Sequence, residues 1–197
     1  MLRHSRTALA ISVGAASLLG LAVTASAQQK KIVIGVQCDR TGPTQIVGTT
    51  ICPAMHDYFR YANANHLLGQ YQIDAPEIDT AYKVPPAVEA YEHQKQQGAV
   101  IMAIYGTPQT HALNERLEKD KIPSTTPGFG IAASADGHRY PYLFPIAASY
   151  FSQGAAAVEF AKKQLGGSLK GKKIAYIYYD NPAGKEPLPV IDKLQKM

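Results

Sequence analysis

The stretch that decides the fold is residues 32–48, IVIGVQCDRTGPTQIVG. Its apolar run leads into a polar turn at Gly42 and Pro43, which indicates a buried strand, a loop and then a helix. The same order recurs downstream, most clearly after the apolar run AVIMAI at 99–104. This alternation predicts an α/β fold with a doubly wound, mostly parallel sheet. Ligands bind outside the carboxyl ends of such strands, so we expect loop 41–48 to form one wall of a binding site.

The N-terminus has the pattern of an export signal. Arg3, His4 and Arg6 precede an uncharged apolar run at 8–23, and the small residues Ala-Ser-Ala follow at 25–27. This order is typical of a secretory signal peptide cleaved after Ala27. The run is short for a membrane span of about 20 residues. We therefore expect a soluble mature protein outside the cytoplasm.

Charge and composition exclude some classes of protein. The 197 residues are 46% hydrophobic and 18% charged, as in ordinary globular domains. The formal net charge is +5, and without the two leader arginines 18 basic residues face 15 acidic ones, a net of +3. The basic residues are scattered along the chain. We expect no nucleic-acid partner, because such proteins concentrate basic residues in a patch or stripe.

The cysteine count is low, with only Cys38 and Cys52. We expect Cys38 at the end of the first strand and Cys52 in the first turn of the following helix, so the two lie near each other. An oxidising compartment permits a disulfide, but the spacing alone does not decide between a disulfide and two separately packed thiols. The six histidines show no metal-ligand spacing with either cysteine, so we expect no metal site.

Hydrophobic periodicity and turn residues predict the remaining elements. We expect an inward stripe on the first helix from Ile51, Met55, Tyr58, Phe59 and Ala62, and packing of the 149–165 helix through Ala156, Phe160 and Ala161. The expected helices are 50–63, one from Pro85 to Gly98, one carrying Leu113 and Leu117, 149–165, and one carrying Leu188, Ile191 and Leu194. The expected strands are 71–79 with an irregularity at Pro76, 99–104, 122–126, 142–144 and 173–179.

Three of the expected strands end in loops with similar chemistry, at 41–48, 106–110 and 127–130. Each combines small residues, hydroxyl groups and backbone N–H groups near a helix start. A helix N-terminus favours an anion, so together the loops predict a site for a carboxylate. One such loop alone is ordinary turn chemistry. The coincidence of three at one sheet edge supports a binding site.

Enzymatic interpretations fit less well. Cys38 opens a loop that superficially resembles a phosphatase phosphate cradle, but Thr44 stands where an arginine is needed to hold the phosphate. The patterns G-x-x-x-x-G-K-[ST], G-x-S-x-G and H-E-x-x-H are missing from the sequence. His111 beside Thr107 is better explained as a partly exposed histidine at a helix start. We therefore expect neither catalysis nor a cofactor.

Several motifs, in order, resemble one family. They are VIGVQCDRTGPT, Asp79 followed by Pro86 and Ala90, YGTPQT, TTPGFG, FPIAASYFSQG and KKIAYIYYDNPAG. They resemble the periplasmic substrate-binding proteins of branched-chain amino-acid-type ABC transporters, which have the leucine-binding-protein-like, type I periplasmic binding fold. The resemblance covers essentially all of the mature chain. It implies two α/β lobes that clamp a small molecule and deliver it to a membrane permease of an ABC transporter from the periplasm.

The resemblance also implies a lobe boundary and a set of site residues. It places the first lobe at 28–147 and an incomplete start of the second lobe at 148–197. The implied ligand-binding residues are Gly106, Thr107, Gly128, Phe129, Gly130, Gln45, Val47, Asn181 and Ala183.

This chain departs from the family pattern at several positions. Val47 and Ala183 stand where amino-acid binders often carry tyrosine, and the disulfide of some members aligns with Tyr82 and Tyr105, so the resemblance implies that it is absent. Phe129 leaves room for an aromatic or other small organic acid or amide.

Two further expectations concern the class of protein and the extent of the chain. The alternative function is an extracytoplasmic ligand-sensing domain of a signalling receptor, because the same fold serves both roles. Met197 falls within an amphipathic helical pattern, which suggests that the chain is a fragment or a truncated reading frame.

Overall fold

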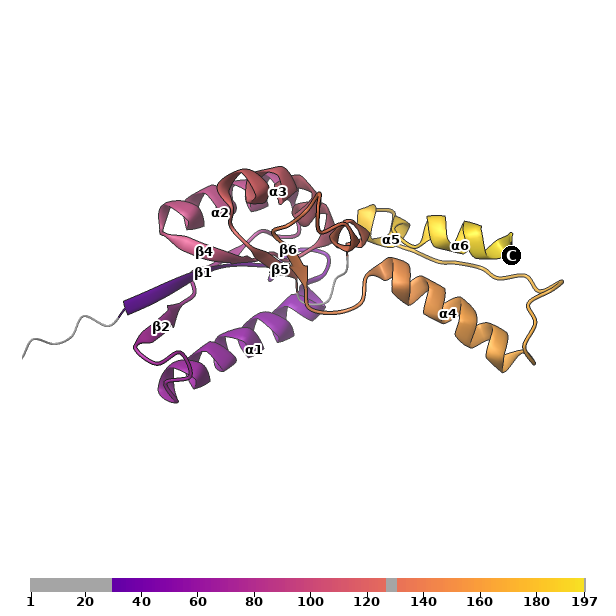
Figure 1. The fold of residues 1–197 in the computed structure, drawn as a ribbon, viewed down its shortest axis with the longest axis horizontal. Helices are drawn as coiled ribbons and strands as arrows, with labels where there is room; N and C mark the ends of the chain where they lie inside the picture. The colour runs from indigo at the N-terminus through magenta and orange to yellow at the C-terminus, as the bar shows by residue number, and fades with distance from the viewer. Residues whose placement is uncertain (1–29, 127–130, 197) are drawn as a thin grey trace, which may run out of the picture.

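A computed structural model describes residues 30–126 and 131–196 (Figure 1). The expected signal peptide at 1–27 and the predicted ligand-binding residues Gly128, Phe129 and Gly130 lie outside the described residues. Among the described helices, none combines the length and the apolar character that a membrane crossing needs.

The described residues form one six-stranded sheet in which every strand pair is parallel. The strand order is β2-β1-β4-β5-β6, and β3 pairs with β1 beyond the end of β2. From β1 the chain continues to β2 and β3, which pair with one edge of β1, and then to β4, which pairs with the other edge. The switch point of the sheet therefore lies between β1 and β4. The expected parallel α/β architecture is confirmed. The strands are β1 (Lys30–Cys38), β2 (Tyr71–Asp74), β3 (Glu77–Asp79), β4 (Ala99–Ala103), β5 (Ser124–Thr126) and β6 (Leu143–Pro145).

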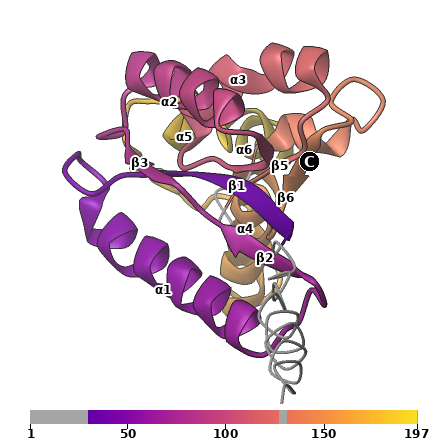
Figure 2. The same ribbon diagram turned by 90° about the vertical axis from the view of Figure 1, so that its left-hand side faces the viewer.

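Helices cover both faces of this sheet (Figure 2). Helix α1 (Gln45–Ala64) lies on one face, and α2 (Val84–Gln96) and α3 (Thr107–Asp120) lie on the other. The main core cluster forms where α2 and α3 meet β4, and it consists of Tyr91, Ala99, Met102, Ile104, Leu113, Leu117 and Ile122. Leu113 and Leu117 are buried, as their helical spacing predicts.

Helix α1 begins five residues before the expected start at Thr50. The cause is the Asp39 carboxylate, which accepts hydrogen bonds from the backbone N–H of Gly42 (2.5 Å) and of Thr44 (2.8 Å), so the turn closes early. Pro53 therefore lies inside the helix rather than in its first turn. The expected inward stripe is also wrong at Tyr58, which is 60% exposed.

The expected strand 71–79 divides into β2 and β3 at Ala75 and Pro76. Pro76 has no backbone N–H for the ladder, which explains the interruption predicted from its position. Its carbonyl oxygen still accepts hydrogen bonds from the Val36 N–H (3.0 Å) and the Gln94 Nε2 (2.9 Å). The two short strands thus remain attached to β1.

Beyond β6 the chain forms helices without a second sheet among the described residues. These helices are α4 (Tyr150–Gln164), α5 (Pro182–Lys185) and α6 (Leu188–Gln195), and α4 packs on α6. The short helix η1 (Ala132–Ala135) lies before β6. Ser149 caps α4, because its Oγ accepts a hydrogen bond from the Ser152 N–H at 3.2 Å. Ala156 and Phe160 of α4 are exposed, so their expected packing is wrong.

The expected strand at 173–179 is not formed. The segment has no assigned strand and is exposed throughout. A strand needs a neighbour for its backbone N–H and C=O groups, and no strand of the described chain pairs with this segment. Its apolar alternation indicates which residues a sheet would bury but does not supply the pairing partner.

Candidate ligand-binding site

The loop after β1 is held by a buried carboxylate. Asp39 has no exposed surface, and besides its two backbone hydrogen bonds it accepts one from the Thr44 Oγ1 at 2.5 Å. The carbonyl oxygen of Thr44 in turn accepts a hydrogen bond from the Tyr105 hydroxyl at 3.2 Å. This bond joins the loop after β1 to the end of β4, at the switch point of the sheet.

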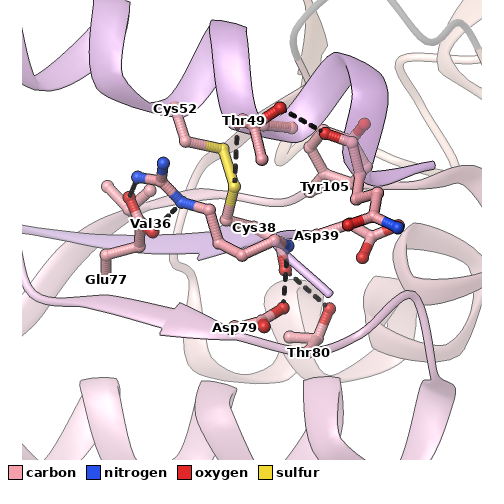
Figure 3. Close-up of a disulfide and its surroundings, with 12 residues drawn as sticks. Val36, Cys38, Asp39, Thr49, Cys52, Glu77, Asp79, Thr80 and Tyr105 are labelled. Atoms are coloured by element: carbon pink, nitrogen blue, oxygen red, sulfur yellow. Dashed lines mark hydrogen bonds and ion pairs between the residues drawn. A yellow bond between two sulfur atoms is a disulfide. The ribbon is translucent and has the colours of Figure 1, made fainter. Parts of the chain in front are cut away.

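A disulfide between Cys38 and Cys52 fixes α1 to the end of β1 (Figure 3). The Cα atoms are 6.4 Å apart, and both residues are fully buried beside Tyr105. Cys52 lies about two turns into α1, because the helix starts earlier than expected. Gly48 permits the close approach, since a Cβ there would overlap the Asp39 carbonyl oxygen. The structure therefore selects the bonded alternative that the sequence left open.

Next to the disulfide lies a charged network of Glu77, Arg40 and His56. The carboxylate of Glu77 accepts hydrogen bonds from Arg40 Nε (2.7 Å) and Nη2 (2.8 Å), and His56 Nε2 lies 2.8 Å from it. Burial alone raises the pKa of Glu77, but the hydrogen bonds from Arg40 and His56 outweigh it and hold the pKa below its ordinary value. The network ties β3 to β1 and α1.

A carboxylate oxygen of Glu77 and the two cysteine sulfurs lie within 4.8 Å of one another. Zinc and similar metals bind cysteine as the thiolate. The two sulfurs are bonded to each other, so this group has no thiolate to offer a metal.

The second part of the loop cluster is the turn from β4 into α3. Gly106 is the N-cap of α3 with φ of +107°, a conformation that glycine adopts without strain. Thr107 and Gln109 follow in the first turn, and both are buried. The helix start has no side-chain cap, and Pro108 has no N–H. The turn thus places polar groups and the positive end of a helix dipole at the carboxyl edge of the sheet.

Three buried polar atoms in this turn have no hydrogen-bond partner in the described structure. They are Thr107 Oγ1 and the two amide atoms of Gln109, Oε1 and Nε2. Buried polar groups in native proteins are nearly always hydrogen-bonded, so each exception needs an explanation. A ligand that completes these bonds is one such explanation.

The start of α5 lies against this loop cluster. Helix α5 contacts α3, and Asn181, just before α5, caps it by accepting a hydrogen bond from the Gly184 N–H at 2.9 Å. Burial raises the pKa of the Tyr82 hydroxyl, and hydrogen bonding with Asn181 opposes that rise. Tyr82 also lies against Gly106, since a Cβ there would come within 2.8 Å of its ring. Segments 80–82, 105–109 and 179–184 therefore meet at one place.

Tyr150 and Glu186 extend this group toward α4. Burial raises the pKa of Tyr150 to about 12, with smaller contributions from Tyr82, Glu186 and Tyr105. Burial also raises the pKa of Glu186, and neither of its carboxylate oxygens has a hydrogen-bond partner in the described structure. The junction between the sheet and α4–α6 is thus rich in tyrosine and contains a desolvated carboxyl group.

The structure brings together some of the predicted site residues. Gly106 and Thr107 are buried at the start of α3. Tyr82 lies against Gly106 and also hydrogen-bonds with Asn181, so Asn181 is close to this helix start. Ala183 is half-buried within α5, which contacts α3. Gln45 and Val47 lie in the first turn of α1, where Gln45 is exposed and Val47 half-buried.

Sequence reasoning missed Gln109, Tyr82 and Glu186. Gln109 falls within the predicted loop 106–110 but has no motif of its own, because glutamine is common at the start of helices. The sequence drew attention to Tyr82 only because it aligns with a disulfide position of some family members. A large hollow of about 490 Å³ lies elsewhere, on the C-terminal half of α4 beside Phe160, Lys163 and Gly167. It lies away from the loops at the switch point, and we assign it no role.

A parallel sheet with loops converging at its switch point defines the doubly wound α/β class, in which ligands bind outside the carboxyl ends of the strands. Residues 31–194 match the family model described as periplasmic binding protein. The chain therefore belongs to the periplasmic binding protein family, and its fold is the type I periplasmic binding fold expected from the motifs. Comparison with curated proteins finds no match.

Solved structures give the same fold. A protein of the Pseudomonas fluorescens group described as an ABC transporter permease is 30% identical with a TM-score of 0.72, over 85% of this chain and 42% of its own. A branched-chain amino acid ABC transporter protein from Thermus thermophilus with bound valine is 21% identical with a TM-score of 0.77, over 85% and 43%.

A solute-binding protein from R. palustris in complex with 4-hydroxybenzoate is 18% identical, with a TM-score of 0.69, over 85% of this chain and 44% of its own. The chain thus spans less than half the length of these structures.

Proposed function

We propose that this protein is the extracytoplasmic solute-binding component of an ABC importer, without catalytic activity of its own. It binds an amino acid or a related small organic acid or amide between two lobes and delivers it to a membrane permease. The proposal includes export to the periplasm with cleavage after Ala27, and lobes at 28–147 and from 148 onward. Intact-mass measurement of the exported protein tests the cleavage site.

The observation that carries this proposal is the buried Thr107 hydroxyl. It lies at the N-terminus of α3, at the switch point of the sheet, and has no hydrogen-bond partner in the described structure. The loop after β1 and the start of α5 lie beside it. Related folds hold valine and 4-hydroxybenzoate, so ligands of this size suit the architecture. A ligand that bonds to Thr107 and contacts α5 would favour the closed arrangement of the two lobes.

A pair of threonine variants tests the site. Thr107→Val removes the hydroxyl at nearly constant shape, and Thr49→Val makes the same change on the exposed surface of α1. A thermal-shift panel of amino acids, organic acids and amides identifies the ligand, and titration calorimetry measures its affinity. Loss of one hydrogen bond weakens binding about tenfold in Thr107→Val, whereas Thr49→Val binds like wild type.

The same variant has an opposite effect on the protein without ligand. Because Thr107→Val removes an unpaired buried polar atom, the unliganded variant should unfold at a temperature at or above that of wild type. Stabilisation together with weaker binding distinguishes a ligand contact from a structural residue. Unchanged affinity in Thr107→Val would discard this site.

A further inference from the structure

Gln109 is a buried side chain whose hydrogen bonds are unmade. It is the third residue of α3, has no exposed surface, and neither its Oε1 nor its Nε2 has a partner in the described chain. A glutamine at this helix position commonly bonds back to the backbone N–H of the N-cap residue. Gln109 folds back toward the N-cap, because a Cβ on Gly106 would overlap its Oε1. It nevertheless does not make that bond, so helix capping does not explain it.

The unpaired groups around Gln109 are of both kinds. Its Nε2 is a donor, its Oε1 is an acceptor, and the neighbouring Thr107 hydroxyl is either. All three lie in the first turn of α3, and Gln109 Oε1 and the ring of Tyr82 both lie against Gly106. A ligand that satisfies them must present a donor and an acceptor side by side.

Hydrogen bonding to Gln109 distinguishes a carboxylate from a primary carboxamide, although the two groups have the same shape. A carboxylate only accepts hydrogen bonds, so it would pair with Gln109 Nε2 but leave Gln109 Oε1 facing a negative charge. A primary carboxamide offers its NH₂ to Oε1 and its C=O to Nε2, which forms two bonds with the Gln109 amide.

The charges around this turn act in opposite directions on an anionic ligand. The buried Asp39 carboxylate belongs to the loop that Tyr105 contacts through Thr44. Besides burial, which is the larger cause, Asp39 raises the pKa of the hydroxyls of both Tyr82 and Tyr105. The half-buried Glu186 carboxyl lies close enough to Tyr150 to raise the pKa of its hydroxyl too. The N-terminus of α3 favours an anion and these carboxyl groups disfavour one, so the discrimination between the two ligand groups rests on the donor and the acceptor of the Gln109 amide.

We infer that Gln109 determines ligand specificity and that the group it recognises is a neutral primary carboxamide. The inference rests on the proposed function, because it names the ligand class of that same site. Gln109 has no exposed surface and α5 contacts α3. The ligand therefore enters when α5 moves away from α3 and becomes enclosed when the two meet again.

The experiment uses the 197-residue chain and matched ligand pairs, benzamide with benzoate and propionamide with propionate. Titration calorimetry at neutral pH measures each affinity for wild type, Gln109→Met and Gln109→Glu. Gln96→Met, at the exposed end of α2, is the control. We expect the amide of at least one pair to bind wild type at least about tenfold more tightly than its carboxylate. Gln109→Met should lower that amide affinity about tenfold or more, and Gln96→Met should not change it.

Gln109→Glu keeps the shape of the side chain but replaces the donor with an acceptor. It should also weaken amide binding, so the test does not depend on the folding of one variant. Tighter binding of the carboxylates by wild type, or wild-type amide affinity in Gln109→Met, would overturn the inference. Binding of carboxylates that depends on Thr107 and not on Gln109 overturns it while the proposed function stands. A chain that binds no amide, organic acid or amino acid overturns both.

Discussion

The ring of Tyr82 meets the ring of Tyr105 edge-on, with centroids 6.3 Å apart and ring planes at 82°. Tyr82 lies between β3 and α2, and Tyr105 follows β4. The family resemblance aligns these two positions with a disulfide of some members. In this chain the same two segments are joined by an aromatic contact, and the disulfide joins Cys38 to Cys52 instead.

A double-mutant cycle on Tyr82→Leu and Tyr105→Leu should give a coupling energy of about 1 kcal/mol, as expected for edge-to-face aromatic pairs. Urea unfolding of the four proteins measures it. Tyr58 and Tyr61 on α1 provide an exposed comparison pair, because their centroids are also 6.3 Å apart but their ring planes meet at 33° and both side chains are largely exposed. Equal coupling in the two pairs would show that burial and edge-on geometry add nothing to the Tyr82–Tyr105 contact.

Replacing both Cys38 and Cys52 with alanine should lower the free energy of unfolding by about 3 kcal/mol, the loop-entropy value for a bridge that closes about 15 residues. Denaturant titration of wild type and the double variant measures the difference. Full reduction of wild type should produce a similar loss, and reductant should leave the alanine variant unchanged. A loss well under about 1 kcal/mol would mean that the bridge does not constrain the unfolded chain.

Glu77 predicts an acid-dependent part of the stability. Its folded pKa lies below the ordinary value of 4.5, because the hydrogen bonds from Arg40 and His56 outweigh burial. A lowered folded pKa contributes stability that is present above the unfolded pKa and is lost as pH falls through the folded pKa. The gap in unfolding free energy between wild type and Glu77→Gln should therefore be present above about pH 5.5 and shrink below about pH 4.

Denaturant titrations at a series of pH values measure this gap, and the comparison with Glu77→Gln separates Glu77 from the other carboxyl groups. Glu159→Gln, on the exposed surface of α4, should show a small gap that does not change with pH. A Glu77 gap that persists unchanged into acid would contradict the lowered pKa.

Gly106→Ala should destabilise the protein by about 2 kcal/mol or more. The residue has φ of +107°, which is strained for alanine, and the new Cβ would overlap Gln109 Oε1 and approach the Tyr82 ring to 2.8 Å. Gly137→Ala is the control, because its Cβ would meet no atom within 4 Å and its φ is not positive. Thermal unfolding compares the two variants. A Gly106→Ala protein as stable as Gly137→Ala would mean that the β4–α3 turn relaxes freely.

Much of the fold follows from local patterns. The apolar runs at 32–38 and 99–104 and the small-residue turns after them predicted β1, β4 and the helices α1 and α3. The proline at 76 predicted the interruption between β2 and β3. These features depend on side-chain burial and turn chemistry within a few residues, so they can be inferred without knowing the rest of the fold.

The errors occurred where a contact that the apolar pattern does not record decides the outcome. Residues 173–179 have the alternation of a strand, but a strand also needs a neighbour, and the described chain provides none. The start of α1 moved from Thr50 to Gln45 because the Asp39 side chain binds the turn. Phe160 has helical spacing, but whether it is buried depends on what packs against α4.

The sequence by itself determined the α/β order, the family, and the strand-end loops in which a ligand site was expected. Only the tertiary structure decided that Cys38 and Cys52 are bonded, and that Tyr82 and the start of α5 lie against the first turn of α3. It also revealed the unpaired amide of Gln109. Hydrophobic periodicity records which face of an element is buried, whereas a hydrogen bond is made or left unmade by atoms brought together from distant parts of the chain.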